Sequence, residues 1–535
     1  MIVTDKRVVA VFAAYVLLAA AVIFRVGFIN SDVAENADVQ KNTRLLTVGS
    51  TRGMIYDRNF IPLVNREMHT VLTVTPTAEA MKELERVLTA EDYKKIQSKV
   101  SDSRPFVFVC DYYNGNCEDI IPQVIYERYS DTDVATHIIG YTDYEGNGVD
   151  GTEKAYDSIL RNHSGSYSVR YSVDAYGNCL GGIEPEIVDD NYASQGGIVL
   201  TIDYDIQRIC ENAMKINSLE RGAVVVLDAE TSEIIALAST PEYNRDDMSA
   251  SLTDDDRPFL NRAVSAYPVG SVFKPVVAAA ALENSVDTDL YFSCDGFINV
   301  SGVKFNCHNR SGHGMVNMSD AMCVSCNAYF ISLGIDVGSS AVISLARALG
   351  FGRADEICDN MVTASGNLPD ENAIDSSAAL ANLSFGQGEL LATPVQIAAV
   401  YSAFANSGYY NEPYLCRFIL DKNGDIEAYY KNESSRKVLT EGVCNDILEM
   451  LELTVEEGSG KLAKPMNGKA YGKTATAETG QYEDGEKIVH TWFAGIYEYN
   501  NKKYTIVVFR ENGNSSSTDC APVFRDIADM ISGKN

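Results

Sequence analysis

The sequence predicts an α+β protein in which an N-terminal apolar helix precedes two folded regions. Three observations support this. Residues 8–24 form an uncharged run, and short strand-like segments among acidic and glycine-rich turns follow up to about residue 195. After Gly196-Gly197 come two strands, a helical block and three strands. With 535 residues and 46% hydrophobic content, the chain can bury more than one core, and its length indicates about three domains.

The apolar run predicts a membrane anchor at residues 8–29. A helix formed by the uncharged residues 8–24 would be roughly 25 Å long, which is the short end of the range for a membrane span. Apolar residues up to Ile29 extend it. Lys6 and Arg7 precede the run and acidic residues follow it, so the positive-inside rule predicts a cytoplasmic tail at residues 1–7.

The predicted topology is therefore single-pass, in the cell membrane, with everything after the anchor outside the cytoplasm. A signal peptide cleaved at Ala19-Ala20-Ala21 is the alternative, which we disfavour because apolar sequence continues beyond it. The net charge of −30, from 44 basic and 74 acidic residues, opposes nucleic acid and anionic lipid surfaces as partners.

The two folded regions are predicted from hydrophobic periodicity. Residues 30–195 read as an irregular α+β region, with strands at 106–109 and 166–173 and helices at 78–99 and 150–162. In the second region, residues 196–535, we expect helices at 203–216, from Ser271, at 318–333 and at 393–406, and strands at 223–228, 234–238, 470–477, 491–497 and 503–510.

The motif Ser271-Val272-Phe273-Lys274 opens an apolar helical run and indicates a serine nucleophile with a lysine base. A helix brings residues three apart onto one face, and the free N–H groups at its start favour an oxyanion. Alone the motif is weak, because a serine at a helix start is usually a cap and a lysine one turn later is usually solvated.

Two further motifs strengthen this interpretation. Ser325-Cys326-Asn327 lies 54 residues after Ser271, and Lys473-Thr474-Ala475 lies 148 residues after Ser325. S-x-x-K, S-D-N and K-T-G together are the signature of class A β-lactamases and penicillin-binding proteins. The three motifs occur in the order and at the spacing of this signature, and residues 385–390 and 474–480 also match it. Together these matches are too specific to have arisen by chance.

At this point the chain resembles the class B penicillin-binding proteins, the monofunctional D,D-transpeptidases that crosslink bacterial peptidoglycan. Residues 52–59 (RGMIYDRN) look like the motif that opens the family's non-catalytic domain, and Arg128, residues 137–140 and residues 148–153 look like its later motifs. The resemblance covers nearly all of the chain after residue 50. Length, and the absence of a C-terminal repeat module, resemble the shorter penicillin-binding protein A type.

The resemblance implies a domain for each folded region. Residues 30–195 would be a non-catalytic pedestal or dimerisation-like domain. Residues 196–535 would be the transpeptidase domain, in which two strands, an inserted helical block and three closing strands fit a five-stranded antiparallel sheet. It implies no cofactor. Peptidoglycan stem peptides and β-lactam antibiotics would be ligands, and the cytoplasmic membrane and a membrane glycan polymerase would be partners.

The resemblance also implies roles for the motif residues. Ser271 would attack the carbonyl between two terminal D-alanines, and Lys274 would take the serine proton, with burial and Lys473 lowering its pKa. Ser325 would relay a proton to the leaving amine. Asn327 would hold the donor amide and the Lys274 head, although a helix cap also explains an asparagine there.

The strand that carries the third motif is expected to bind the substrate. Lys473, Thr474 and Thr476 would hold its terminal carboxylate, and the backbone N–H groups of Ser271 and Thr476 would form the oxyanion hole. Ala475 departs from the family's usual glycine. Residues two apart in a strand share a side, so its methyl should lie on the Lys473 side, facing the cleft, and tighten it.

Two other classes of function remain open. A β-lactamase or D,D-carboxypeptidase would share Ser271 and pass the acyl group to water, and a non-catalytic β-lactam sensor or scaffold would use the fold only for binding. No deacylating base stands out in the sequence. The long first region and the anchor suit assembly at the cell wall better than a diffusible hydrolase, so the transpeptidase is our first interpretation.

The twelve cysteines are scattered rather than spaced as a disulfide framework. Cys110 with Cys117, and Cys294 with Cys307, are close enough in sequence to bridge. Cys294, Cys307, Cys323 and Cys326 imitate a zinc pattern, but twelve residues separate the first two and the last two bracket Ser325, so we expect no metal.

Histidines and other residues near the motifs are expected to be structural. His308 and His313 read as loop residues, and His490 and Trp492 as packing residues. Residues 386–388 (GQG) match a family loop and should shape the backbone of the site.

Overall fold

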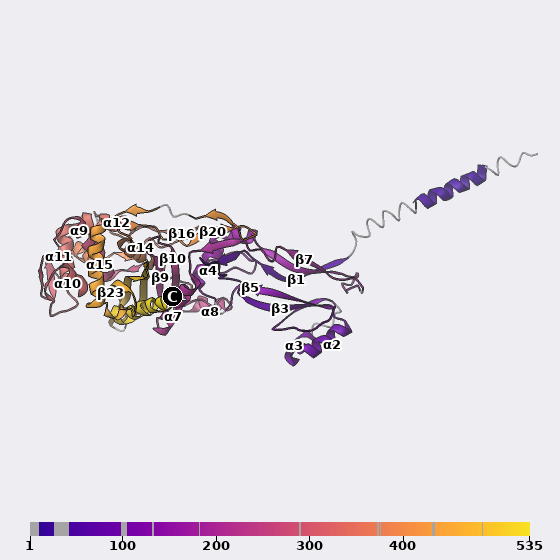
Figure 1. The fold of residues 1–535 in the computed structure, drawn as a ribbon, viewed down its shortest axis with the longest axis horizontal. Coiled ribbons are helices and arrows are strands. Elements are labelled where there is room, and N and C mark those ends of the chain that lie inside the picture. Colours follow the sequence, from indigo (N-terminus) through magenta and orange to yellow (C-terminus); the bar gives the residue numbers. More distant parts are fainter. Residues whose placement is uncertain are drawn as a thin grey trace, which may run out of the picture. The chain divides into compact units, whose positions relative to one another are not determined.

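The computed structural model describes residues 10–25, 42–97, 104–130, 133–180, 182–287, 290–371, 374, 376–430, 434–483 and 485–534. The expected cytoplasmic tail 1–7 and both ends of the expected anchor, 8–9 and 26–29, lie outside them. The chain forms two compact units (Figure 1). Unit 1 comprises residues 1–51, 67–127 and 164–193, and unit 2 comprises residues 52–66, 128–163 and 194–535.

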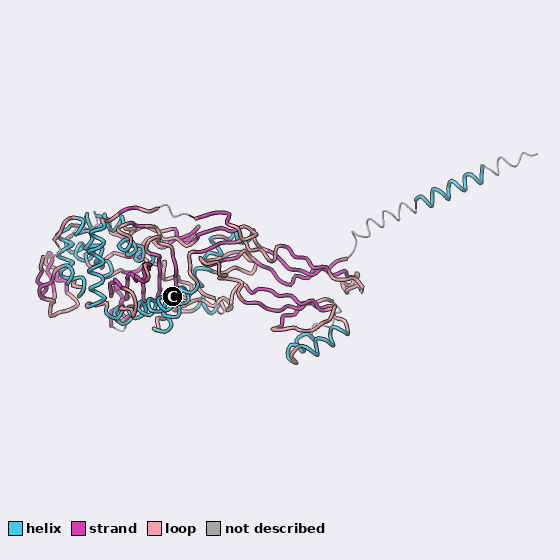
Figure 2. The backbone as a smooth tube through the Cα atoms, viewed as in Figure 1, coloured by secondary structure: helices cyan, strands magenta, loops and turns pink. Residues whose placement is uncertain are grey.

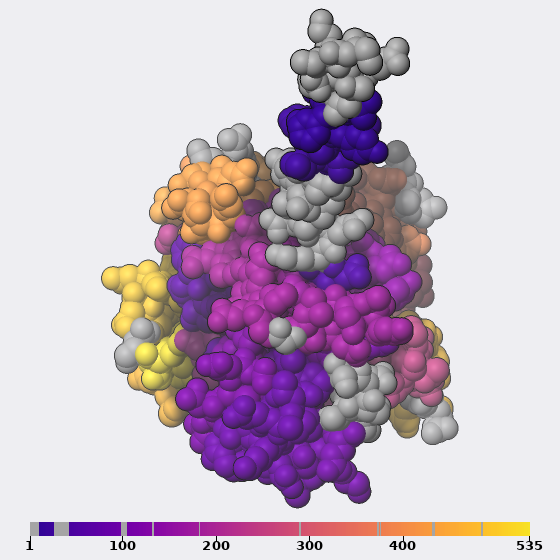
Figure 3. All heavy atoms as spheres, turned by 90° about the vertical axis from the view of Figure 1, so that its right-hand side faces the viewer, coloured from indigo at the N-terminus to yellow at the C-terminus, as the bar shows by residue number. Residues whose placement is uncertain are grey.

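Unit 1 contains two three-stranded sheets. One has the order β1-β6-β7 and the other β4-β3-β5, and all neighbours within each are antiparallel. Their strands are β1 (Thr43–Thr51), β3 (Glu67–Val74), β4 (Phe106–Cys110), β5 (Ile120–Glu127), β6 (Gly165–Ser172) and β7 (Glu186–Asp190). In Figure 3 the magenta residues of β6 and β7 lie directly against the violet residues of the second sheet.

The alternation of side chains along β3 explains how unit 1 is layered. Val71 packs with Val48 and Val169 between the two sheets. Its neighbour Leu72 points to the opposite face and packs with Leu84 of α2 (Ala78–Val87) and with α3 (Ala90–Gln97). A strand that is apolar on both faces is buried on both, as observed here.

Unit 2 is built on a five-stranded antiparallel sheet of order β10-β9-β25-β24-β23, which confirms the sheet expected from the sequence. The strands are β9 (Gly222–Asp228), β10 (Ile234–Thr240), β23 (Lys469–Glu483), β24 (Glu486–Tyr499) and β25 (Lys502–Gly513). β23 is an edge strand and extends well beyond the predicted residues 470–477.

Helices cover both faces of this sheet (Figure 2). Val224 and Val226 of β9 pack with α7 (Tyr204–Ile216) and α17 (Ala521–Gly533). Val225 and Leu227 of the same strand face the helical block on the other side. That block contains α9 (Lys274–Glu283), α10 (Met318–Cys323), α11 (Asn327–Val337), α12 (Ser339–Ala348), α13 (Ser377–Ser384), α14 (Pro394–Ala405) and α15 (Glu441–Glu456).

The helix expected at 318–333 is two helices. The helix α10 begins with a capping box between Asn317 and Asp320, and it ends before Ser325. Ser325 has φ +56°, a left-handed conformation that a right-handed helix cannot contain, so the chain turns before α11 begins. The helix expected at 150–162 is likewise divided, into α5 (Gly151–Ala155) and α6 (Asp157–Asn162).

The boundary between the units differs from the single boundary expected near residue 196. β2 (Met54–Tyr56) pairs in parallel with β8 (Gly197–Leu200), which pairs with β20 (Cys416–Leu420) and through it with β21 (Ile426–Tyr429). This four-stranded sheet places residues 52–66 in unit 2. Pairing between segments so far apart in sequence has no local signal.

A buried ion-pair cluster places residues 128–163 in unit 2 as well. Glu153, whose side chain is fully buried, accepts from Arg52 Nε at 2.7 Å and from Arg128 Nη2 at 2.6 Å. Tyr129 donates its hydroxyl to the same carboxylate at 2.9 Å. The residues that resemble motifs of the family's non-catalytic domain thus meet within one unit and hold its discontinuous segments together.

The remaining short elements of unit 2 complete the fold. They are α4 (Thr136–Ile139), α8 (Met248–Thr253), β11 (Tyr267–Pro268), β12 (Phe292–Cys294), β13 (Phe297–Val300), β14 (Val303–Asn306), β15 (Gly314–Val316), β16 (Glu356–Cys358), β17 (Met361–Val362), β18 (Leu391–Ala392), β19 (Tyr409–Tyr410), β22 (Arg436–Lys437) and α16 (Ser516–Asp519). Two 3-10 helices, η2 (Gly270–Phe273) and η4 (Lys461–Ala463), accompany them.

Within the described residues, no single helix is both long and apolar enough to cross a membrane. The helix Ala10–Arg25 is apolar but shorter than a span requires. α11 and α12 are long and apolar enough only when taken together, and they are bent by 97° relative to one another.

Candidate active site

Ser271 lies in η2, which runs directly into α9. The backbone N–H of Lys274 donates to the Ser271 carbonyl, so the motif forms one 3-10 turn. Residues three apart in such a turn lie above one another, which brings the two side chains to the same side. Pro275 sits in the first turn of α9, where its fixed φ suits a helix start.

Lys274 joins the first two motifs. Its side chain is fully buried, and Nζ donates to the Ser325 carbonyl at 2.8 Å, to Ser325 Oγ at 3.1 Å and to Asn327 Oδ1 at 2.8 Å. The left-handed backbone of Ser325 lets its carbonyl and its hydroxyl meet the same ammonium group. The structure therefore brings together Lys274, Ser325 and Asn327 as the sequence predicts.

Burial governs the protonation of both lysines. Burial lowers the pKa of Lys274 to about 8, because a charged ammonium is poorly solvated there. Lys473 is also fully buried, and burial together with the charge on Lys274 holds the pKa of Lys473 well below its usual range. The close approach of Gly270 to Ala475 and Ala477 places β23, the strand that carries Lys473, beside the nucleophile turn.

The third motif lies on the edge strand β23. Lys473 Nζ donates to the Thr474 carbonyl at 3.2 Å, and Thr474 Oγ1 donates to Ser459 Oγ at 2.8 Å. Thr476 is exposed and its hydroxyl reaches Ser516 Oγ at 3.4 Å. The oxyanion hole from the N–H groups of Ser271 and Thr476, and the carboxylate-binding roles, stay predictions.

The Ala475 methyl packs against the Gly270 turn, whereas the sequence predicted that it would face the reactive cleft. A Cβ placed on Gly270 would lie 3.3 Å from the Ala475 methyl and 3.2 Å from that of Ala477, so both methyls face the turn before the nucleophile. Ala475 shares the Lys473 side, as alternation requires, but only 2% of it is exposed. The methyl is covered by the Gly270 turn, which needs φ +65° and close approach to β23.

Other segments support the nucleophile turn from behind. Gly270 N–H donates to the Gly386 carbonyl at 2.8 Å, and any Cβ on Gly386 would collide with Gly270. This agrees with the expected structural role of residues 386–388. Trp492 is fully buried and donates from Nε1 to the Pro268 carbonyl at 3.0 Å, and His490 packs edge-on against Tyr267.

Sequence reasoning missed one group beside the site. The ligand atoms of Cys294, Cys307, His313 and Cys326 all lie within 4.8 Å of one another. All twelve cysteines, each of them in the described part of the chain, are free thiols. His313, expected to be a loop residue only, replaces Cys323 in the four-residue pattern that the sequence suggested.

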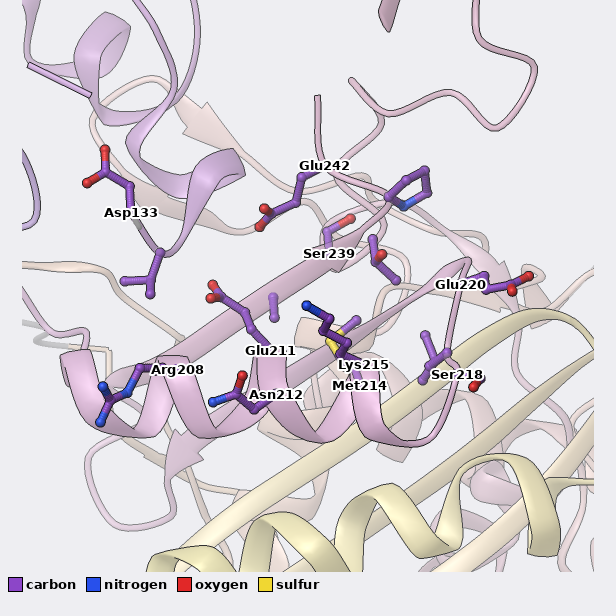
Figure 4. Close-up of a pocket in the computed structure, with 15 residues that line it drawn as sticks. Asp133, Arg208, Glu211, Asn212, Met214, Lys215, Ser218, Glu220, Ser239 and Glu242 are labelled. Atoms are coloured by element: carbon purple, nitrogen blue, oxygen red, sulfur yellow. The ribbon is translucent and has the colours of Figure 1, made fainter. Parts of the chain in front are cut away.

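A pocket of about 660 Å³ lies elsewhere in unit 2 and contains none of the predicted site residues. It is lined by residues of α7 and the end of β10, with Glu211 and Glu242 pointing into it (Figure 4). Burial and the nearby Glu242 raise the pKa of Glu211 to about 7, although Gln207 and the Ala135 N–H donate to its carboxylate.

Known proteins resemble this chain over most of its length. Residues 222–529 match the penicillin binding protein transpeptidase domain. The peptidoglycan D,D-transpeptidase MrdA of Acinetobacter baumannii is 27% identical, over 92% of this chain and 82% of that protein. Stage V sporulation protein D of Bacillus subtilis is 26% identical, over 96% of this chain and 84% of that protein.

Solved structures show the same fold. Penicillin-binding protein 3 of Mycobacterium tuberculosis, in complex with aztreonam, gives a TM-score of 0.66 at 22% identity, over 92% of this chain and 97% of that one. A chain from a peptidoglycan synthase complex gives 0.68 at 22% identity, over 96% and 97%. With a transpeptidase domain over more than half of its length, and the three motifs on the expected elements, the chain belongs to the class B penicillin-binding proteins.

Proposed function

We propose that this chain is a serine D,D-transpeptidase that crosslinks peptidoglycan stem peptides through an acyl-enzyme on Ser271. The observation that carries the proposal is the environment of Lys274. A fully buried ammonium group, with a pKa lowered to about 8, lies one turn from Ser271 and is held by Ser325 and Asn327. A lysine that loses its proton readily near neutral pH can act as a general base.

Acylation moves one acyl group and one proton. Ser271 Oγ attacks the carbonyl between the terminal D-alanines, and its proton passes to neutral Lys274. An ester forms on Ser271, the peptide bond breaks, and D-alanine leaves as its amine receives a proton through Ser325. The 3.1 Å contact between Lys274 Nζ and Ser325 Oγ suits the second step of this relay, because the two atoms are within hydrogen-bond reach.

Deacylation completes the crosslink. An amine of a neighbouring stem peptide attacks the ester carbonyl, and its proton passes to Lys274. The ester C–O bond then breaks, Lys274 gives the proton to Ser271 Oγ, and the new amide is complete. The edge strand β23 supports binding of an extended donor peptide, because an unpaired strand edge can bind a further strand. Lys473, Thr474 and Thr476 would hold the donor carboxylate, and the N–H groups of Ser271 and Thr476 would stabilise the oxyanion.

The names of the relatives support the same reaction. MrdA of Acinetobacter baumannii and FtsI of Escherichia coli are both named peptidoglycan D,D-transpeptidases. The similar chain of known structure belongs to a peptidoglycan synthase complex that coordinates polymerisation and crosslinking. By that likeness we propose a membrane glycan polymerase as partner, and unit 1 as a non-catalytic pedestal.

We further propose that residues 8–29 anchor the chain in the cell membrane in a single pass, with both units outside the cytoplasm. The large apolar side chains of the helix Ala10–Arg25 are exposed, among them Phe12 at 70% and Phe24 at 76%. Such a helix needs an apolar environment. Protease added outside intact protoplasts should digest both units, and their protection would reverse the orientation.

The decisive experiment is covalent labelling by a fluorescent penicillin. The wild-type chain should form a stable adduct that mass spectrometry locates on Ser271. Ser271→Ala should lose labelling while its circular dichroism is unchanged. Ser249→Ala, on an exposed position of α8, is the matched control and should label normally. Labelling that persists in folded Ser271→Ala overturns the assignment, and rapid release of the adduct would favour a β-lactamase.

A further inference from the structure

Three cysteines and a histidine converge beside the second motif. His313 Nδ1 lies 3.5 Å from the sulfur of Cys294 and 3.5 Å from that of Cys307, and the sulfurs of Cys307 and Cys326 are 4.0 Å apart. Three of the four side chains are buried, and His313 is partly buried. We propose that Cys294, Cys307, His313 and Cys326 bind one zinc ion, which fixes the Ser325–Asn327 turn of the active site.

The distances match a tetrahedral zinc site. Zinc–sulfur bonds of about 2.3 Å and zinc–nitrogen bonds of about 2.0 Å at tetrahedral angles place two sulfurs about 3.8 Å apart, and a sulfur and a nitrogen about 3.5 Å apart. The observed separations are 4.0 Å and 3.5 Å. Four protein ligands fill a tetrahedron, so the site is closed and structural rather than catalytic.

The ligands come from a small region with little apolar core of its own. β12 pairs with β15, and the hairpin of β13 and β14 lies between them in sequence. Cys294 ends β12, Cys307 follows β14, and His313 precedes β15. Val303 is 47% exposed and Met315 60% exposed, so this region buries little apolar surface. A metal supplies the stability that a small core cannot.

Backbone N–H groups already point at the sulfurs. The Asn327 N–H donates to Cys307 Sγ at 3.3 Å, and the Ala328 N–H also bonds to this sulfur. The Tyr329 N–H bonds to Cys326 Sγ. These donors belong to the first turn of α11, where unpaired N–H groups favour negative charge, so they suit thiolate ligands.

The site lies within the catalytic motif itself. Cys326 is the residue between Ser325 and Asn327, and both neighbours contact Lys274 Nζ. Asn327 Nδ2 also donates to the Asn306 carbonyl, next to Cys307, at 3.3 Å. A metal bound to Cys326 and Cys307 would therefore hold the left-handed Ser325 and the Asn327 amide in register with Lys274. This effect on acylation rests on the proposed function, whereas metal binding does not.

The donor set favours zinc. Thiolate ligands are soft and imidazole suits zinc, and a four-coordinate set of three sulfurs and one nitrogen is a common structural zinc set. Binding requires three thiolates and a neutral imidazole, so three thiol protons are released. The bound site carries a net charge of −1, from +2 on the metal and −3 on the ligands. That charge lies near Lys274.

Metal content tests the site directly. The full-length chain, purified under reducing conditions without added metal, should contain about one zinc per chain by elemental analysis. Cobalt substitution should give the strong thiolate-to-cobalt charge-transfer band and the intense d–d bands of a tetrahedral three-thiolate site. His313→Ala, in a partly exposed loop, should lose the zinc, and His313→Cys should keep it. Cys323→Ser, a buried thiol outside the set, is the matched control and should also keep it.

Three results would overturn the zinc site. A reduced wild-type chain that neither contains zinc nor binds added cobalt contradicts it. A disulfide between any two of the three cysteines that persists under these reducing conditions contradicts it too. Equal loss of zinc in Cys323→Ser and His313→Ala would place the metal elsewhere.

The positioning role has a separate readout. Removing zinc with a chelator should slow penicillin acylation by about 10- to 100-fold, as loss of supporting ligand contacts commonly does, and added zinc should restore the rate. Acylation that is unchanged in the zinc-free chain overturns the positioning role. A zinc-loaded chain with the predicted cobalt spectrum that is never acylated supports the metal site and contradicts the proposed function.

Discussion

Lys274 donates a hydrogen bond of 2.8 Å from Nζ to Oδ1 of Asn327, which begins the helix that follows the second motif. The bond joins two helices of the block, α9 and α11, through a buried ammonium group. It fixes the direction in which the Lys274 head points, and it makes Asn327 the first residue to test.

Asn327→Ala should slow acylation without unfolding the protein. A hydrogen bond to a charged group contributes about 1.5–3 kcal/mol, so its loss predicts roughly a 10- to 150-fold lower second-order rate with a fluorescent penicillin. Asn423→Ala, on an exposed turn between β20 and β21, is the control. A rate within twofold of wild type would show that Asn327 does not position the lysine.

Glu153→Ala should destabilise unit 2 strongly. The substitution removes the shared carboxylate of Arg52 and Arg128, and breaking a buried ion-pair network typically costs about 3–5 kcal/mol. Denaturant unfolding followed by tryptophan fluorescence reports on this unit, because the single Trp492 is buried in its sheet.

The matched control for this prediction is an exposed pair of the same unit, Lys487 and Glu478, whose atoms are 2.8 Å apart. Glu478→Ala should leave the unfolding midpoint unchanged, because solvent screens an exposed pair. Equal effects of the two substitutions would mean that the Glu153 cluster is not essential.

The stability of unit 2 should fall as pH rises from about 4.5 to 7. Burial and Glu242 raise the pKa of Glu211 from 4.5 to about 7, so the folded chain holds this proton more tightly than the unfolded chain does. The contribution is complete below about pH 4.5 and is lost as pH rises through 7, by at most about 3 kcal/mol.

Glu211→Gln should flatten this pH dependence, because glutamine imitates the protonated carboxyl. Unfolding free energies at pH 5 and pH 7.5 measure it, and the variant should gain relative to wild type at the higher pH. Glu220→Gln, an exposed residue of the same pocket, should keep the wild-type slope. A slope of the same size in Glu211→Gln would assign the effect to other groups, of which Asp133, Arg208, Lys215 and Glu242 line this pocket.

Ala475→Val should slow acylation by all β-lactams, and Ala475→Gly should not select among them. Extra methyl groups would press on Gly270 and displace the Ser271 turn, and overpacking of this kind costs about 1–3 kcal/mol. Second-order rates for a bulky cephalosporin and a small penicillin should fall together. A gain confined to the cephalosporin in Ala475→Gly would show that the methyl faces the ligand, as the sequence alone suggested.

Local patterns predicted the elements that carry the three motifs. The three motifs lie on a helix start, an interhelical turn and a strand, and the five strands were located to within a few residues except for the long extensions of β23 and β24. Hydrophobic alternation and helical periodicity act over short distances, so these elements can be read from neighbouring residues. The penicillin-binding protein A subtype and the oxyanion hole stay predictions.

Features set by distant contacts were missed. A left-handed serine such as Ser325 has no sequence signal, because only its tertiary partners stabilise it. His313 was not recognised as a ligand because twelve, five and twelve residues separate the four ligands, unlike the short C-x-x-C spacing of most zinc sites. Residues 52–66 belong to unit 2, on the other side of the boundary expected at 196, because β2 pairs in parallel with β8. No local pattern predicts such a pairing.

The discontinuity of unit 2 sets an order of events during synthesis. All residues of unit 1 have been made by residue 193, whereas β2 of unit 2 must wait for β8, and β8 for β20. A nascent chain halted after residue 193 should therefore hold a protease-resistant unit 1 and two cleavable stretches, 52–66 and 128–163. The catalytic unit, although it supplies some of the earliest translated residues, is the last part of this protein that can mature.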